Sequence, residues 1–313
     1  MKQTILITGG SGFLGRHLGK VLSKNYRVIL GARNNKQNIS SQKITGCESC
    51  PLDVSNIESV RDSFREFKPD IVIHAAATKF VDLAEKMPME CIDVNVVGSQ
   101  NVARVSIECD VKSVIGISTD KSAPPVRNTY GLSKALMERM FCSMNEKSKT
   151  QFVCVRYGNV AWSTGSVLPI WAEMFEKNQT IRTTGPEMRR FFFTVDDAVL
   201  LVNAAIEGVN EFAGKVLCRE MKAAKMIDII KVWIDSKGGS WENMKGRPGE
   251  RNDEFLIGEL ELPYTKELQI NGINHYLISF NEKVSNPLPS ILSSENAEKL
   301  TNEEILEILS ARP

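Results

Sequence analysis

Thr4-Ile-Leu-Ile-Thr-Gly-Gly-Ser-Gly-Phe-Leu-Gly15 is the most informative segment of this chain for its fold. It begins with a short apolar segment, Thr4–Ile7, that predicts a buried β-strand, and the glycines follow almost at once. A helical pattern then covers His17–Ser23. A strand, a glycine-rich turn and a helix in this order indicate the first unit of a dinucleotide-binding α/β fold.

The glycines of this turn have separate physical roles. Gly9 permits a tight turn, Gly12 lets a diphosphate approach the backbone, and Gly15 lets the helix pack closely on the sheet. Free N–H groups at the helix start then bind the diphosphate. We expect contacts to the dinucleotide from Gly9, Ser11, Gly12, Phe13, Leu14 and Gly15. The alternative is a glycine-rich loop without a function.

The end of the second strand bears on which dinucleotide is bound. Strand Arg27–Leu30 leads into Gly31-Ala-Arg33-Asn34, where an NAD site usually carries Asp or Glu for the ribose hydroxyl. No acid is present, and Arg33 offers a fixed cation for a 2′-phosphate and a plane that can stack on adenine. The sequence therefore favours NADP over NAD. The alternative is that Arg33 is a solvated loop residue.

Strands and helices continue to alternate after this point. Residues 35–46 are polar and predict a loop, and Cys50–Val54 ends a third strand with Asp53 at the adenine edge. Strand 70–73 leads into His74–Lys79, where small side chains leave room for a cofactor, and Asn95 lies in a predicted helix at 89–109. The further expected cofactor contacts are Asp53, Val54, Ala75, Ala76, Lys79, Asn95, Tyr130, Lys134 and Val160.

The alternation predicts the fold class α/β, with a Rossmann-type doubly wound parallel sheet and a smaller C-terminal α/β substrate domain. We place an NADP-binding domain at 1–160 and a mainly substrate-binding domain at 161–313, and we expect a helix at 196–207 to pack back on the first. Other expected strands are 152–157 and 190–194, and other expected helices are 56–67, 129–148, 167–177, 224–236 and one starting at Thr301.

A second short stretch carries the chemistry. Ser118-Thr-Asp-Lys121 follows an apolar strand pattern at 111–117, so Asp120 and Lys121 are expected at the carboxyl end of a strand, where open α/β sheets bind ligands. Tyr130-Gly-Leu-Ser-Lys134 follows closely, with Tyr130 and Lys134 on one helix face. An acid, two amines and a phenol are therefore expected together. A structural Asp120–Lys121 ion pair is the alternative.

Composition excludes several other classes of protein. The 313 residues are 42% hydrophobic and 25% charged with a net charge of +1, so nucleic acid and membrane surfaces are not expected partners. Cys47 and Cys50 form one CxxC among seven cysteines, and the three histidines are isolated, so no metal site is expected. The cysteine spacing favours reduced thiols in a cytoplasmic enzyme, and the first residues lack a signal-peptide pattern.

The motifs together resemble the extended short-chain dehydrogenase/reductases. Within that group, further segments are similar to soluble UDP-N-acetylglucosamine 4,6-dehydratases, most of all the C5-inverting kind that starts pseudaminic acid synthesis. These segments are His74-Ala-Ala-Ala-Thr-Lys79, Ser118–Lys121, Arg156-Tyr-Gly-Asn-Val160, Arg190-Phe-Phe and Arg247-Pro-Gly-Glu250. Departures are Phe80 for His, Met87 for Asn, and Arg251 and Asp253 for Lys and His, whereas Glu254 is retained.

The resemblance implies a reaction without net redox change. Tyr130 takes the proton of the sugar 4-hydroxyl while hydride passes to NADP, and the charge of Lys134, together with that of the cationic nicotinamide, lowers the pKa of the phenol toward neutrality. Lys121 is then the base for C5–H and Asp120 the acid for the departing 6-hydroxyl, so the amine must be neutral and the carboxyl protonated. Thr119 belongs to the same catalytic group.

Substrate contacts are also implied by the resemblance. Arg247 would pair with the diphosphate and Glu250 would bind the ribose, with a solvated turn as the alternative for both. The remaining expected contacts to the nucleotide sugar are Lys79, Asn159, Gly165, Ser166, Val167 and Arg190. A homo-oligomer is expected through the helices at 89–109 and 129–148.

Three other functions remain open on the sequence. A retaining 4,6-dehydratase would use the same residues with a different C5 outcome. A sugar-nucleotide epimerase or 4-keto reductase shares the glycines, Tyr130 and Lys134 but does not need the Asp120–Lys121 pair. A catalytically silent NADP-binding regulator would need neither pair.

Overall fold

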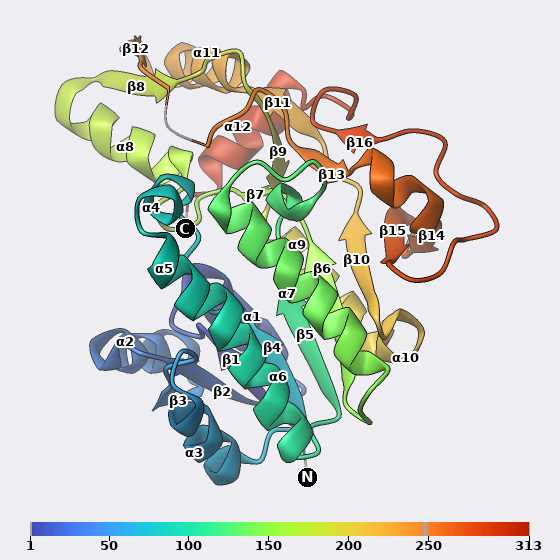
Figure 1. The fold of residues 1–313 in the computed structure, drawn as a ribbon. Helices are drawn as coiled ribbons and strands as arrows, with labels where there is room; N and C mark the ends of the chain where they lie inside the picture. Colours follow the sequence, from blue (N-terminus) through green and yellow to red (C-terminus); the bar gives the residue numbers. More distant parts are fainter. Residues whose placement is uncertain (1, 247–248, 313) are drawn as a thin grey trace.

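The computed structural model describes residues 2–246 and 249–312. Its main feature is a nine-stranded sheet in the order β14-β15-β10-β6-β5-β4-β1-β2-β3 (Figure 1). The strands are β1 Thr4–Thr8, β2 Arg27–Ala32, β3 Glu48–Pro51, β4 Ile71–His74, β5 Ser113–Ile117, β6 Gln151–Arg156, β10 Lys215–Arg219, β14 Thr265–Ile270 and β15 Ile273–Ser279. From β3 to β10 neighbouring strands are parallel, which confirms the predicted doubly wound α/β fold.

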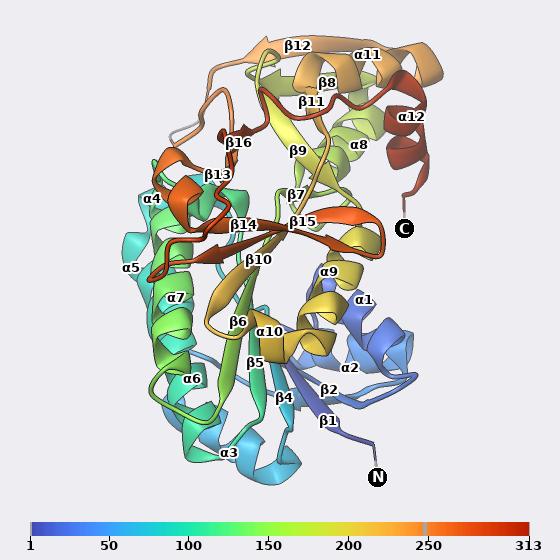
Figure 2. The same ribbon diagram turned by 90° about the vertical axis from the view of Figure 1, so that its right-hand side faces the viewer.

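Helices cover both faces of this sheet. Figure 2 shows α3, α6 and α7 on one side of the strands and α1, α2, α9 and α10 on the other. Their bounds are α1 Phe13–Leu22, α2 Asn35–Thr45, α3 Ile57–Phe67, α6 Gly98–Glu108, α7 Thr129–Asn145, α9 Val195–Glu207 and α10 Val209–Phe212. The central strands are buried on both faces because of this cover, and β1 and β5 are buried at every residue.

The long helix predicted at 89–109 contains a local irregularity. It comprises α5 Pro88–Cys91, a π-helical turn at Ile92–Val97, and α6, and α4 Val81–Lys86 precedes it. Such π-helical turns in α-helices are frequent at functional sites. Asn95 lies in this turn, so the irregularity bears on how that side chain is aimed.

A second group of elements lies beyond the carboxyl ends of the parallel strands (Figure 2). It contains β7 Asn159–Val160, α8 Val167–Asn178, β8 Thr180–Thr184, β9 Arg189–Phe193, β11 Ala223–Lys225, α11 Met226–Lys237, β12 Ser240–Met244, β13 Phe255–Ile257, β16 Leu292–Ser293 and α12 Asn302–Ser310. A separate core fills it, in which Trp233 packs edge-on against Trp171 and Phe175. Short 3₁₀ turns at Asp120–Ser122 and Glu259–Tyr264 complete the described elements.

The structure corrects two local predictions. Residues 35–46 were expected to form a loop, but α2 spans Asn35–Thr45 and is capped by Asn34, whose side chain accepts from the Gln37 N–H. The helix predicted at 224–236 is preceded by strand β11, and α11 starts at Met226.

The C-terminal half also contributes to the main sheet. Strand β10 pairs with β6, the β14–β15 hairpin extends that edge, and α9 packs against α1 and β6. The hairpin turns at Asn271 and Gly272, both with positive φ, which suits the twist of its strands. The division into domains at residue 160 therefore stays a prediction. Among the described residues, no helix is long and apolar enough to cross a membrane.

Candidate active site

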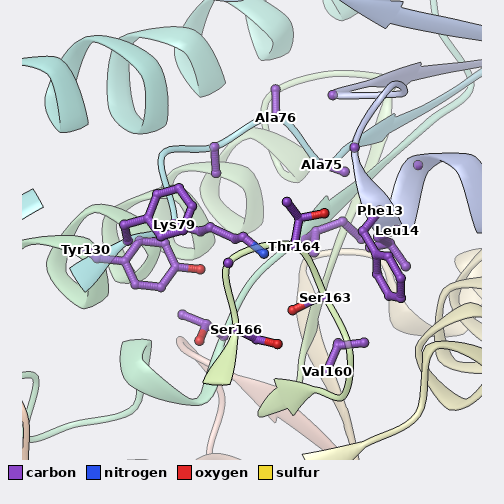
Figure 3. A pocket seen from close by; sticks show the side chains of 18 of the residues that line it. Phe13, Leu14, Ala75, Ala76, Lys79, Tyr130, Val160, Ser163, Thr164 and Ser166 are labelled. Carbon is purple, nitrogen blue, oxygen red and sulfur yellow. The ribbon is translucent and has the colours of Figure 1, made fainter. Parts of the chain in front are cut away.

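A cavity of about 910 Å³ lies at the carboxyl ends of the central parallel strands. Its wall combines the turn after β1, the segments after β4 and β5, the start of α7, and the loop that follows β7. Figure 3 shows Lys79 and Tyr130 together with Ser163, Thr164 and Ser166 of the loop that follows β7. The cavity therefore lies where open α/β sheets bind their ligands.

The turn after β1 fits a dinucleotide. Gly9 has a φ of +70°, and a Cβ atom there would lie 2.8 Å from the backbone nitrogen of Ala76, so only glycine allows this approach. Helix α1 begins after Gly12 without a side-chain cap, which leaves its first N–H groups available for a diphosphate. The predicted contacts Gly9, Ser11, Gly12, Phe13, Leu14, Gly15, Ala75 and Ala76 all line the cavity.

Arg33 lines the same cavity. Its exposed side chain lines the wall together with Asn34, Gln37 and Ser40 at the start of α2. Val54 and Val160 line the cavity as predicted. An arginine beside polar side chains is a suitable environment for a phosphate group.

Two predicted cofactor residues are engaged elsewhere. Asp53 is absent from the cavity wall, and its Oδ1 accepts hydrogen bonds from the N–H and Oγ of Ser55. Asn95 is fully buried, and its amide bridges the backbone of Thr78 and the Oγ of Ser133 at 2.8–3.0 Å. Asn95 therefore fixes the wall segment carrying Lys79 to helix α7 without facing the cavity itself.

The predicted acid and amine meet at the 3₁₀ turn after β5. Thr119 caps this turn and lines the cavity. Lys121 Nζ lies 3.0 Å from Asp120 Oδ1, 3.6 Å from Glu254 Oε1 and 3.3 Å from Asn159 Oδ1. Asp120 is fully buried, and its second oxygen, Oδ2, has no hydrogen-bond partner in the described structure. Lys121, with 14% of its side chain exposed, lines the cavity, so it does not point into bulk solvent.

The charges of this cluster are shifted in different directions. Burial raises the pKa of Asp120, so its carboxyl retains a proton more readily than usual. The pKa of Glu254 is lowered because Lys121, Arg190 and Arg251 outweigh its burial. The pKa of Lys121 is raised, since Asp120 and Glu254 outweigh its burial. In the free protein these carboxylates favour a protonated Lys121, so the neutral Lys121 needed for the elimination step stays a prediction, whereas a protonated Asp120 agrees with the direction of its shift.

Tyr130 and Lys134 are both buried on α7 and line the cavity. Lys134 donates from Nζ to the carbonyl of Ile117 at 2.7 Å, and burial lowers the pKa of Lys134 to about 8. Burial raises the pKa of Tyr130 to about 12, although the charge of Lys121 and the side chain of Thr119 lower it. The fall of the Tyr130 pKa toward neutrality, expected with the cationic nicotinamide bound, stays a prediction.

The loop that contains Gly165 packs against an aromatic ring. Gly165 has a φ of +72°, and its α-carbon faces the ring of Phe80 so closely that a Cβ would collide with it. Lys79 lies over the same ring at 5.9 Å, and burial lowers the pKa of Lys79. Of the predicted substrate contacts, the cavity wall contains Lys79, Asn159, Gly165, Ser166, Arg190 and Glu250.

Two predicted substrate residues are not found there. Val167 starts α8 outside the cavity wall, and Arg247 lies outside the described residues. Conversely, Glu254 lines the cavity, yet no role for it was predicted. Its only sequence signal was its place at the end of the motif around Glu250, because Glu254 is far from Lys121 along the chain. Among the described residues, no cluster of His, Cys, Asp and Glu could hold a metal ion.

Comparison with protein families places the chain among known sequences. A family model described as polysaccharide biosynthesis protein matches residues 5–273. The chain is 34% identical over 320 residues to the capsular polysaccharide biosynthesis protein CapD of Staphylococcus aureus, covering 96% of this chain and 53% of that protein. This chain therefore spans about half the length of CapD.

Two shorter relatives carry names of individual enzymes. Identity is 32% over 288 residues to the UDP-N-acetylglucosamine 4,6-dehydratase (inverting) of Campylobacter jejuni, covering 89% of this chain and 83% of that protein. It is also 32%, over 332 residues, to a UDP-glucose 4-epimerase of Rickettsia bellii, covering 98% of this chain and 95% of that protein. Sequence identity alone does not separate the two names.

Solved structures show the same fold. The X-ray structure of Pen from Bacillus thuringiensis matches with a TM-score of 0.90 at 26% identity, covering 99% of this chain and 98% of that one. The UDP-glucose 4-epimerase of Thermus thermophilus, solved in complex with NAD, matches with a TM-score of 0.70 at 22% identity, covering 82% of this chain and 91% of that one. At that low identity the second likeness concerns the fold alone.

Proposed function

The chain belongs to the polysaccharide biosynthesis protein family, among the extended short-chain dehydrogenase/reductases, and we propose that it is a UDP-N-acetylglucosamine 4,6-dehydratase. Its coarser class is that of nucleotide-sugar dehydratases and epimerases. The observation that carries the proposal is the Asp120–Lys121 pair at 3.0 Å beside Tyr130. An epimerase needs Tyr130 but has no step that uses this pair.

The first chemical step needs a base for the sugar 4-hydroxyl. A bound dinucleotide supplies reversible hydride transfer with the sugar. Tyr130 takes the hydroxyl proton, and the positive charges of Lys121 and Lys134 stabilise the phenolate that forms. Because the pKa of Tyr130 is about 12 in the free protein, the step depends on the added charge of the oxidised nicotinamide.

The elimination needs a neutral amine and a protonated carboxyl. The hydrogen bond between Lys121 Nζ and Asp120 Oδ1 allows one proton to pass from the ammonium to the carboxylate, which creates both groups at once. Burial favours this neutral pair because it removes two charges from a site shielded from water. Lys121 then accepts the C5 proton and Asp120 protonates the departing 6-hydroxyl, which leaves as water. The two residues return to their charged forms in the same step.

The product distinguishes this proposal from the second candidate. Epimerisation is favoured by the contacts of Lys121 Nζ with the carboxyl groups of Asp120 and Glu254, which raise its pKa and keep the amine protonated, and a protonated amine cannot act as a base. Mass spectrometry after incubation with UDP-N-acetylglucosamine tests both. A product lighter by one water supports dehydration, and an isomeric product supports epimerisation and removes the elimination step. Stereochemistry at C5, for which we favour inversion, follows from NMR of that product.

We infer NADP as the dinucleotide, because Arg33 lines the cavity where an NAD site would carry an acid. Isothermal titration with NADP and NAD measures the preference directly. Arg33→Ala should weaken NADP binding about tenfold or more and leave NAD binding nearly unchanged. Equal weakening of both would show that Arg33 contributes only stacking on adenine.

We also infer a homo-oligomer. Large apolar side chains are exposed along the helices of the predicted interface: Met89 at 70%, Leu132 at 58%, Leu136 at 52% and Ile92 at 41%. Apolar surface of this kind on two neighbouring helices suits self-association. Light scattering should give more than one chain per particle, and Leu132→Glu with Leu136→Glu should give one.

The state of the cysteines indicates the cellular compartment in which the protein works. All seven cysteines are unpaired, and six of them are buried. Reduced thiols are usual in proteins of reducing compartments, so we infer a cytoplasmic location. Fractionation of the source cells followed by detection of the chain tests this inference.

A further inference from the structure

Glu254 is a buried carboxylate on the cavity wall for which the proposed reaction has no use. Its side chain is 4% exposed, and it lines the same cavity as Lys121. Oε1 lies 3.6 Å from Lys121 Nζ, and Oε2 accepts a hydrogen bond of 2.8 Å from Arg251 Nε. Each oxygen of Glu254 therefore faces a different cation.

The backbone around Glu254 is held from several sides. The N–H of Glu254 donates to Ser294 Oγ at 3.0 Å, and its carbonyl accepts from the Ser294 N–H at 2.8 Å. The buried guanidinium of Arg156 donates to the carbonyl of Leu256 at 2.9 Å, two residues further along. These contacts bring a distant segment of the chain to the catalytic turn and leave Glu254 little freedom to move away.

Charged groups face Lys121 from each of the elements packed around it. Asp120 lies on its own turn, Glu254 precedes β13, and Arg190 comes from β9 with its Nε 4.0 Å from Glu254 Oε1. Tyr130 approaches from α7. Arg251, clamped by a further hydrogen bond to the carbonyl of Pro125, lies behind Glu254. Glu254 lies between Lys121 and two arginines. Its negative charge therefore offsets the repulsion between those arginines and the ammonium of Lys121.

We propose that Glu254 is the positioning residue of Lys121: it holds the amine at the cavity wall and sets how readily that amine releases its proton. Arg251 acts through Glu254, because it shares the carboxylate charge with Lys121. The catalytic consequence rests on the proposed function of Lys121 as the C5 base. The claim that Glu254 holds Lys121 and sets its proton affinity does not depend on that function, and it can be tested without measuring turnover.

The direct test follows the proton of Lys121 in the full-length protein. Trace labelling with acetic anhydride at a series of pH values, followed by peptide mass spectrometry, gives the titration midpoint of Lys121. Glu254→Gln keeps the shape of the side chain and removes its charge, so the midpoint should fall by at least about one pH unit, a tenfold change in proton affinity. Asp253→Asn is the matched control, since Asp253 pairs with Arg189 and should leave the midpoint unchanged.

A second variant gives the opposite sign. Arg251→Gln removes the cation paired with Glu254 Oε2 and leaves more of the charge of Glu254 to act on Lys121, so the midpoint should rise. An unchanged midpoint in both Glu254→Gln and Arg251→Gln would overturn the proposal, and so would an equal shift in Asp253→Asn. If Glu254→Gln does not fold, the labelling midpoint of Arg251→Gln still tests the proposal.

Turnover provides the separate readout for the reaction. If the proposed function holds, the acidic limb of the pH dependence of kcat/KM in Glu254→Gln should move to lower pH together with the labelling midpoint, and Glu254→Asp should restore much of the wild-type profile. A shifted labelling midpoint without turnover on any nucleotide sugar contradicts the dehydratase assignment and leaves the role of Glu254 intact.

Discussion

Two buried clusters of charge lie close together in this protein, and their contrast separates support from chemistry. The Arg156 cluster joins Arg156 to Glu138 and Glu261, with every side chain at most 4% exposed. The Lys121 cluster joins Lys121 to Asp120 and Glu254, with Lys121 14% exposed on the cavity wall. Burial is therefore common to both clusters, and the difference lies in how completely each is paired.

The Arg156 cluster is fully satisfied. Its guanidinium makes two hydrogen bonds to Glu138 at 2.6 and 3.0 Å and two to Glu261 at 2.8 Å each. In the Lys121 cluster, by contrast, Asp120 Oδ2 has no partner among the described residues, and the pKa of Asp120 is raised. An ion cluster in which every charged atom has a partner fixes the backbone segments that it joins. A cluster next to a cavity that has an unpaired oxygen can still bind a substrate group.

The two clusters are physically connected. Ser122 lies on the same turn as Asp120 and Lys121, and its Oγ is within hydrogen-bond distance of Glu138 Oε1, at 2.9 Å, and of the carbonyl oxygen of Thr119, at 2.6 Å. Because Glu138 lies on α7, the rigid cluster ties the catalytic turn to the helix that carries Tyr130. Substitutions in the two clusters, and one at the nearby Lys134, test this difference.

The largest effect on stability is expected in the rigid cluster. Arg156→Met leaves two buried carboxylates without their cation, so the free energy of unfolding should fall by about 3–5 kcal/mol. Urea unfolding measures the change. Arg182→Met is the matched control, since its pair with Glu242 is more than half exposed and should contribute less than about 1 kcal/mol. Equal losses in the two variants would contradict the structural role of Arg156.

In the Lys121 cluster the large effect should fall on turnover. Lys121→Ala should lower kcat by about 10²-fold or more, because it removes the proposed base. NADP binding measured by titration should stay close to wild type, and urea unfolding should change far less than in Arg156→Met. Full turnover in Lys121→Ala would remove Lys121 from the mechanism.

The variant Lys134→Met tests how the burial of an amine without a carboxylate partner affects stability. Its folded pKa of about 8 is below the usual 10.5, so the unfolded chain binds more protons between these values and stability must rise with pH there. Compared with Lys134→Met, the wild type should gain up to about 3 kcal/mol from pH 8 to pH 10.5 and show no further change below pH 8. Urea unfolding across this range checks the sign, and a pH-independent difference would contradict it.

The smallest effect is expected at Asp120. Its raised folded pKa means that the folded protein loses stability relative to the unfolded chain as pH rises through that pKa, and Asp120→Asn removes this loss. The variant should therefore be at least as stable as wild type at neutral pH, within about 1 kcal/mol. Glu138→Gln, the matching change in the rigid cluster, should cost several times more. A large loss in Asp120→Asn would show that the ion pair of Asp120 with Lys121 is needed for stability, as the Arg156 cluster is.

The same contrast explains which features were predictable from sequence. The glycine turn at Gly9 and the spacing of Lys121 and Tyr130 are local patterns, so they predicted the parallel sheet and most of the cavity wall. Helix α2 was missed because it lacks an apolar face. Its buried residues are polar, and Asn38 is held by hydrogen bonds to the carbonyls of Ala32 and Cys50.

Charge states depend on contacts that no local pattern contains. Glu254 reaches Lys121 only because β13 folds back onto the catalytic turn, and this contact adds to that of Asp120 in raising the pKa of Lys121. The orientation of Asn95 away from the cavity likewise depends on the π-helical turn and on Ser133 in another helix. Sequence spacing predicted which groups gather, and only their packing sets their protonation.

NMR of the product formed from UDP-N-acetylglucosamine in heavy water is the sharpest test of the elimination at the Lys121 cluster. We expect the Lys121 cluster to remove the C5 proton, and we expect C5 to regain a proton from solvent later in the reaction. The wild-type product should therefore have lost water and should carry deuterium at C5. Lys121→Ala should form no such product. A wild-type product that keeps the mass of the substrate, or that has no deuterium at C5, contradicts the proposed elimination.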